Sequence, residues 1–191
     1  QDPEIAQFWN GLPDNLSKLE NVIWAENPAN LDDYAWCRGS DGISRVWHPG
    51  FHEGENFGWA GAPDIVAEYK GKIVLGDLKT SNGPYYSQWP DSSTPKNEYG
   101  KRRAGFMKYQ KCQLQLAAYA LGLEHTIGVV PELCMTFVAT KEISQVFVIQ
   151  KGTIEKYKNK WRETVKKYYE VILPEQKERE IEMLGIDGDI M

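Results

Sequence analysis

Cysteine is scarce in this chain of 191 residues: Cys37, Cys112 and Cys134 lie far apart, and none belongs to a C-x-x-C pair. Their odd number and wide spacing argue against disulfide staples, a zinc knuckle and an iron–sulfur cluster. We therefore expect small buried or half-buried thiols in a reducing compartment. An intracellular location follows as an expectation.

Long apolar runs and glycine-rich phosphate loops are missing as well. No window approaches the roughly 18 apolar residues of a membrane span, so no membrane association is expected. No glycine-rich loop follows a predicted strand, which argues against dinucleotide-binding and P-loop folds. The chain starts at Gln1, not at Met, and opens with no basic-then-apolar signal segment, which indicates a trimmed or processed form.

A net positive charge is also lacking, since the chain carries a net charge of −5 and has a pI near 5.3. Nucleic-acid binders usually present a basic face, so this balance counts against such a partner. The total does not decide the matter, because a nuclease concentrates carboxylates that a bound metal ion neutralises. The length and a hydrophobic content of 41% suit one globular domain.

What the sequence does contain is an alternation of strand and helix patterns. In the first third of the chain we predict a short amphipathic helix and turn over 3–19, a strand at Asn21–Glu26, and an elaborated hairpin or loop over 27–60 with a short strand at Ile43–Trp47. The middle should form a hairpin of Ala62–Tyr69 and Lys72–Leu78, a polar loop over Thr80–Gly100 and a helix over 104–123. The last part should form strands at Leu133–Ala139 and Gln145–Ile149, a helix over Thr153–Ile172 and a charged tail over 173–191. This order is no repeated βαβ array, so it predicts a single α/β domain with a mixed central sheet flanked by helices.

The predicted hairpin carries the chemistry of greatest interest. Asp77 and Lys79 are two residues apart on a strand, so they share one face, and with Lys70-Gly71 as the turn Asp64 falls near Asp77. Two carboxylates this close repel each other, and a divalent cation removes that penalty. Oxygen ligands suit one or two Mg²⁺ or Mn²⁺ ions. Lys79 could then orient or deprotonate an attacking water, or neutralise a developing oxyanion.

The same spacing permits a plainer interpretation. Asp77 and Lys79 could form an ordinary ion pair at the end of a strand, with Asp64 starting a turn after Pro63. Spacing alone does not separate this structural role from the catalytic one.

Three motifs in order add a family resemblance. Gly61-Ala62-Pro63-Asp64 followed by Asp77-Leu78-Lys79-Thr80-Ser81 resembles the G-x-x-D and D-x-K-T-[SG] signature of the PD-(D/E)XK nuclease superfamily. Gln115 and Tyr119, on the following predicted helix, match the Q-x-x-x-Y motif of its RecB-type exonuclease branch. Residues 61–72 are also similar to the G-x-x-D-x-V-A-x-Y-x-G-K pattern of the mitochondrial genome maintenance exonuclease and related phage exonucleases.

This resemblance implies a restriction-endonuclease-like core over about residues 20–172. It also implies an Mg²⁺- or Mn²⁺-dependent exonuclease that acts on DNA with free ends, prefers single strands and serves replication, recombination or repair. The expected location is then the cytoplasm of a bacterial or phage-infected cell, or the mitochondrial matrix. It implies that the backbone carbonyl of Leu78 binds metal and that Gln115 and Tyr119 belong to the catalytic site. Relatives also place a metal-binding glutamate at the end of the preceding strand, for which Glu26 is the best match. A solvated strand-end acid is the alternative for Glu26, and Glu53 and Glu55 are rival ligands.

One departure from the family concerns histidine. Relatives carry a helix with a His upstream of that glutamate, whereas the histidines here are His48, His52 and His125, all after Glu26. Either His48 or His52 could take its place, although a single loop histidine is more often a bystander. The departure puts full activity in doubt.

Candidate DNA contacts surround the motif-bearing helix. Lys108 and Lys111 share a stripe with Gln115 and Tyr119, at steps of three and four residues. The cluster Lys101-Arg102-Arg103 suits phosphate contacts, and Tyr85, Tyr86 and Trp89 offer faces on which unpaired bases could stack. The alternatives are a solvated basic helix start and aromatic side chains that cover the core.

Two other functions remain open from the sequence. One is a DNA-end-binding or recombination-accessory module that keeps the fold without catalysis. The other is a restriction-type endonuclease, which shares the D-x-K core but is disfavoured by the Q-x-x-x-Y helix.

Overall fold

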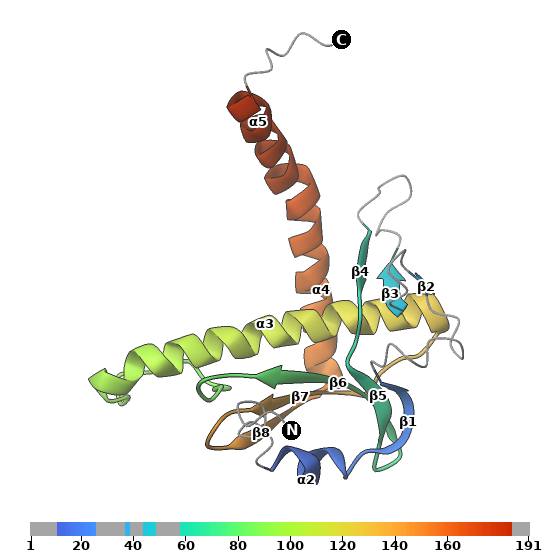
Figure 1. Ribbon diagram of the computed structural model, residues 1–191, viewed down its shortest axis with the longest axis vertical. Helices are drawn as coiled ribbons and strands as arrows, with labels where there is room; N and C mark the ends of the chain where they lie inside the picture. Colours follow the sequence, from blue (N-terminus) through green and yellow to red (C-terminus); the bar gives the residue numbers. More distant parts are fainter. Residues whose placement is uncertain (1–10, 26–36, 39–43, 49–57, 185–191) are drawn as a thin grey trace.

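A five-stranded mixed sheet forms the centre of the protein in a computed structural model, which describes residues 11–25, 37–38, 44–48 and 58–184 (Figure 1). Its strands, in spatial order, are β1 (Glu20–Ala25), β5 (Ile65–Tyr69), β6 (Lys72–Thr80), β7 (Leu133–Ala139) and β8 (Ser144–Gln150). Only β6 and β7 pair in parallel; the other neighbours in this sheet are antiparallel. The expectation of an α/β fold with a mixed sheet flanked by helices is confirmed.

The hairpin of β5 and β6 forms where the sequence predicts it. Lys70 and Gly71 have φ angles of 52° and 72°, the left-handed values that a two-residue type I′ turn requires. The first strand of this hairpin, predicted as Ala62–Tyr69, is three residues too long. Regular pairing begins only at Ile65, because the nearby Pro63 has no N–H to donate. Ile65 pairs with Gly76, which brings the preceding Asp64 next to Asp77.

The parallel pair β6 and β7 needs a crossover, and α3 (Lys96–Ile127) supplies it. The helix is longer than the predicted 104–123, because residues 96–103 are mostly helix-compatible and contain an ion pair between Glu98 and Arg102 one turn apart. It ends at Gly128, whose φ of 70° stops the helix in the left-handed conformation.

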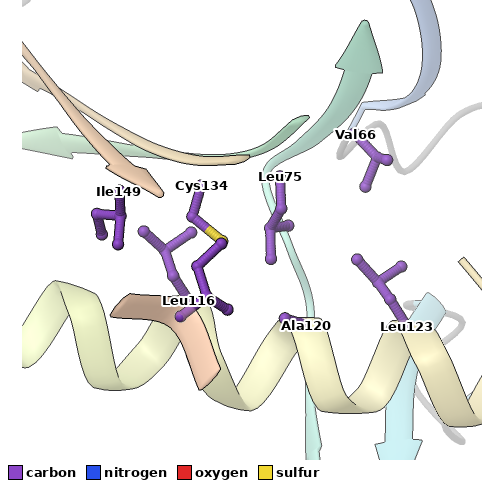
Figure 2. Packing of buried hydrophobic residues seen from close by; sticks show 8 residues of the cluster. Val66, Leu75, Leu116, Ala120, Leu123, Cys134 and Ile149 are labelled. Atoms are coloured by element: carbon purple, nitrogen blue, oxygen red, sulfur yellow. The ribbon is translucent and has the colours of Figure 1, made fainter. Parts of the chain in front are cut away.

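Both faces of the sheet are covered. On one face, Leu116, Ala120 and Leu123 of α3 point toward Leu75 and the other sheet residues of one hydrophobic cluster (Figure 2). On the opposite face, α2 (Leu12–Leu16) packs with Val74 and Phe137 in a second cluster. Adjacent residues of β6 thus enter opposite cores, as expected for a strand buried on both faces.

The last helices form a rod that crosses α3 and projects away from the sheet (Figure 1). It consists of α4 (Lys151–Lys167), a π-helical turn η2 (Tyr168–Ile172) and α5 (Leu173–Leu184). Residues 173–184 of the predicted charged tail are therefore helical. Good helix formers and an Arg179–Glu175 ion pair continue the helix, and the π-turn comes just before Pro174, which lacks an N–H donor.

A small three-stranded sheet lies beside the carboxyl-terminal half of α3 (Figure 1). It is made of β2 (Cys37–Arg38), β3 (Ser44–His48) and β4 (Trp59–Gly61). The short strand expected at Ile43–Trp47 corresponds to β3, shifted by one residue. In the part of the chain that the structure describes, no helix is long and apolar enough to cross a membrane.

Candidate active site at the end of β6

Asp77 and Lys79 form a close ion pair on the face of the sheet that α3 covers. The Lys79 ammonium donates a hydrogen bond to Asp77 Oδ1 at 2.8 Å and lies 2.7 Å from Oδ2. Asp77 is fully buried, whereas the Lys79 side chain keeps 27% of its exposure. The ion pair that the plainer interpretation expects is thus present, but it lies in the interior and not at a solvated strand end.

This pairing leaves the Asp77 carboxylate poorly compensated. Burial raises the pKa of Asp77 to about 6, and the nearby Asp64 carboxylate adds to the rise, although the contact with Lys79 lowers it. Asp77 Oδ2 is buried and accepts no hydrogen bond, despite its closeness to the ammonium. A stabilising structural ion pair would lower the pKa of its acid. The raised pKa therefore means that a further cation would stabilise the ionised Asp77 carboxylate.

The Asp64 carboxylate is fixed by the backbone of the opposite strand. Its Oδ2 accepts a hydrogen bond from the Leu78 N–H at 2.5 Å. This hydrogen bond holds Asp64 beside Asp77, as the hairpin register requires, and it uses only one of the two Asp64 carboxylate oxygens. Two carboxylates, one on β6 and one just before β5, therefore lie close together.

Gln115 and Tyr119 meet next to these acids. The Gln115 side-chain amide donates a hydrogen bond to the Tyr119 hydroxyl at 2.7 Å. Burial raises the pKa of Tyr119, and the charges of Asp77, Lys79 and Asp64 all act on it. The Tyr119 ring also packs on Gly61, where an added Cβ would lie 2.4 Å from Cε1. The glycine of the first motif and the tyrosine of the last therefore fit together physically.

Two neighbours of Asp77, Thr136 and Cys112, were not expected as site residues. Thr136 pairs with Asp77 across the parallel strands, and its buried Oγ1 has no hydrogen-bond partner. Burial raises the pKa of the Cys112 thiol to about 11, and Asp77 contributes to the rise; the thiol also contacts Tyr85. No sequence signal points to Thr136, because only strand pairing brings it beside Asp77.

The basic and aromatic candidates pair with each other at the start of α3. Arg102 lies over the Tyr86 ring at 5.5 Å, and Arg103 lies over the Trp89 ring at 5.6 Å. Trp89 stays 46% exposed, so it can still present a surface to a ligand. Lys101 and Lys111 are exposed. These contacts place cations and aromatic faces side by side, the combination that single-stranded nucleic acids bind.

Tyr85 plays a different role from that of Tyr86 and Trp89. Its ring is buried in a hydrophobic cluster, so it covers the core instead of offering a stacking face. Two hydrogen bonds with the Gln145 side chain anchor its backbone, at 2.9 and 3.1 Å. Lys108 lies 5.8 Å over the same ring and donates a hydrogen bond to Ser81 Oγ.

Several expected metal ligands lie outside the part of the chain whose side chains the structure describes. Glu26, Glu53, Glu55 and His52 lie outside the described residues, and the side chain of His48 is not described either. Among the residues that are described, no group of three or more His, Cys, Asp and Glu side chains could hold a metal ion. Of the expected side-chain ligands, the structure describes only Asp64 and Asp77.

Comparison with known proteins adds no relative to this picture: no protein-family model and no curated protein matches the chain.

Proposed function

We propose that the protein is a metal-dependent DNA exonuclease with a PD-(D/E)XK core of the RecB type. The observation that carries the proposal is the fully buried Asp77, whose Oδ2 accepts no hydrogen bond although Asp64 and Lys79 lie against it. Burying such a group has a cost that structural roles rarely justify, and perturbed groups of this kind concentrate at functional sites.

The residues present fit a hard divalent cation. Two adjacent carboxylates repel each other, and burial makes the Asp77 charge costly, so a cation between Asp64 and Asp77 would relieve both effects. Oxygen ligands of this kind suit Mg²⁺ or Mn²⁺, and the Leu78 carbonyl would be a further ligand. The ion, when bound, would activate water and neutralise charge on the phosphate.

A further carboxylate is proposed from the register of β1. Ala25 ends this strand and pairs with Ile65, the residue after Asp64. The next residue in the chain, Glu26, is therefore our candidate for an additional metal ligand. Its replacement by Gln should weaken metal binding without removing the Asp64–Leu78 contact.

The protein's own groups would position the reactants. Lys79 keeps its charge: burial lowers the pKa of Lys79, but the hydrogen bond to Asp77 and the charges of Asp77 and Asp64 together outweigh burial and raise it. Its partly exposed ammonium can therefore hold a water or a phosphate oxygen beside Asp77. Gln115 and Tyr119 form a hydrogen-bonded pair along the same site, and both can donate to a phosphate oxygen.

The experiment that tests this function uses DNA labelled at the 5′ or the 3′ end. Single-stranded, duplex, flap and closed circular substrates are incubated with the protein in Mg²⁺, in Mn²⁺ and in EDTA. We expect metal-dependent release of short products from substrates with free ends, and none from closed circles. Asp77→Asn should abolish cleavage, whereas Asp14→Asn, an exposed substitution on α2, should not.

The other functions give different results in the same assay. Cleavage of closed circles would favour an endonuclease. Binding to DNA ends without metal-dependent turnover would favour an accessory module. Equal cleavage by the wild type and by Asp77→Asn would overturn the proposed site.

A further inference from the structure

A pocket of about 350 Å³ opens beside the Gln115–Tyr119 pair, between β4, α3 and α4. Its lining combines aromatic, small and polar side chains from these three elements: Trp59, Ala60, Gly61, Lys111, Leu114, Gln115, Ala118, Tyr119 and Trp161. The volume is at the lower end of the roughly 300–1,000 Å³ typical of ligand sites, which suits one small ring system.

Two tryptophans form an aromatic corner of this pocket. The rings of Trp59 and Trp161 meet edge to face, with centroids 5.9 Å apart and an interplanar angle of 77°. The Trp59 indole donates a hydrogen bond to the Ala118 carbonyl at 3.4 Å, and Tyr169 holds the start of β4 through the Gly58 carbonyl at 2.8 Å. Fixed rings of this kind are good stacking platforms, because little conformational entropy is lost on binding.

Polar side chains also line the pocket, among them Gln115 and Lys111. Lys111 contributes a positive charge from the exposed side of α3, suited to a phosphate attached to that ligand.

The pocket and the candidate active site share a wall. Tyr119 lines the pocket; burial raises its pKa, and the charges of Asp77, Lys79 and Asp64 also act on that pKa. Gly61 lines it too, three residues before Asp64 along the chain. A group bound in the pocket is therefore next to whatever binds at the two carboxylates.

We propose that this pocket receives one unpaired nucleobase of a DNA strand whose neighbouring phosphate lies at Asp64 and Asp77. The inference rests on the proposed nuclease function and deepens it. A paired base is already stacked and hydrogen-bonded within its duplex, so the pocket selects a single strand or a frayed end. The structural preference for unpaired DNA then comes from the small sheet and α4, not only from the β6 site.

Binding of abasic oligonucleotides tests the proposal. The probe is a fluorescent single-stranded DNA of eight nucleotides, bound to the full chain with Ca²⁺ in place of Mg²⁺, because Ca²⁺ also binds carboxylate oxygens. One abasic position is moved along the strand. Base–aromatic stacking is worth about 1–3 kcal/mol, so removal of the pocketed base should weaken binding about 5- to 150-fold. We expect this loss at one position and smaller losses elsewhere.

Filling the pocket supplies the matched variant. Ala60→Leu adds bulk at the lining without touching the carboxylates, and Ala104→Leu adds the same bulk at an exposed position of α3. In Ala60→Leu the position-specific abasic loss should disappear, whereas in Ala104→Leu it should persist. Trp161→Phe, which keeps a ring but offers a smaller stacking face, should weaken binding of the intact DNA and leave binding of the abasic DNA unchanged.

The outcomes separate this inference from the proposed function. Suppose that cleavage depends on metal but every abasic position weakens binding equally, or that the loss at one position is the same in the wild type and in Ala60→Leu. Either result would overturn the proposed base pocket and leave the proposed nuclease function intact. Absence of both cleavage and DNA binding would overturn the two proposals together. Equal affinity for single-stranded and blunt duplex DNA would also contradict the pocket's selectivity.

Discussion

Asp77 and Lys79 are in contact, with the ammonium 2.8 Å from Oδ1, yet the pKa of Asp77 is raised to about 6. Burial outweighs the ion pair, and the Asp64 carboxylate acts in the same direction as burial. The pair is therefore not a net stabiliser of the ionised acid. This relationship decides how stability, metal binding and activity should depend on pH.

Replacing Asp77 by asparagine should stabilise the metal-free protein at neutral pH. A pKa raised from 3.8 to about 6 makes the ionised acid unfavourable by about 3 kcal/mol at most, and asparagine removes that cost while leaving Lys79 unpaired. We expect a net gain of about 1–2 kcal/mol in the free energy of unfolding at pH 8. Urea unfolding in EDTA measures it.

The gain in unfolding free energy from Asp77→Asn should increase as the pH rises. The folded protein binds the Asp77 proton more tightly than the unfolded chain does, so wild-type stability falls as the pH rises from about 4 to 6. Below pH 4 the advantage of Asp77→Asn should vanish. The control Asp14→Asn, at an exposed site, should show no such pattern; a constant gain from pH 3 to 8 would contradict the assignment.

Metal affinity should rise with pH through the acid range. A cation at Asp64 and Asp77 competes with the Asp77 proton, whose pKa is about 6. We expect the Mn²⁺ association constant to increase about tenfold per pH unit below pH 6 and to level off above it. Calorimetric titration from pH 5 to 8 measures this, and Asp77→Asn should bind weakly at every pH. An affinity independent of pH would count against the two-carboxylate site.

Lys79→Ala should lower the cleavage rate about 10²- to 10⁴-fold, the usual contribution of a positioned acid–base or charge-stabilising group. Lys72→Ala is the matched control, because Lys72 is exposed at the opposite end of the same strand. Circular dichroism should show that both variants keep the fold. Cleavage by Lys79→Ala at the rate of Lys72→Ala would remove Lys79 from the site.

Gly61→Ala should damage both stability and activity. The added Cβ would lie 2.4 Å from Tyr119 Cε1, so the ring must shift away from its place beside the carboxylates. We expect a loss of about 1–3 kcal/mol in unfolding free energy, typical of overpacking. Gly152→Ala, where nothing lies within 4 Å, should be neutral or slightly stabilising. Equal stability of the two variants would show that Tyr119 relaxes without cost.

Arg103→Ala should weaken DNA binding through the loss of one phosphate contact. Arg103 is exposed and lies over the exposed Trp89. For a single strand, the slope of log affinity against log salt should fall in magnitude by about 0.7. Arg179→Ala on α5 is the control, since Arg179 is exposed and paired with Glu175. An unchanged slope for Arg103→Ala would exclude this contact.

Much of the central sheet could be predicted because its signals are local. The bounds of β7 match the expected Leu133–Ala139, and the Lys70-Gly71 turn fixes the register that brings Asp64 to Asp77. Alternation, turn residues and helical spacing act within a few residues, so the sequence carries them directly. The differences from the predicted elements fall at element ends and in α5, where i,i+4 pairs and the π-turn before Pro174 continue a helix beyond its apolar stripe.

The sequence by itself therefore determined the hairpin, the motif-bearing helix and the three residues Asp64, Asp77 and Lys79 as candidates. Only the tertiary structure decided that Asp77 is fully buried, that Thr136 stands beside it, and that Trp59 and Trp161 enclose a pocket next to Tyr119. Burial, parallel strand pairing and the packing of α4 on α3 join residues far apart in the chain, and such long-range contacts leave no periodic trace in a single sequence.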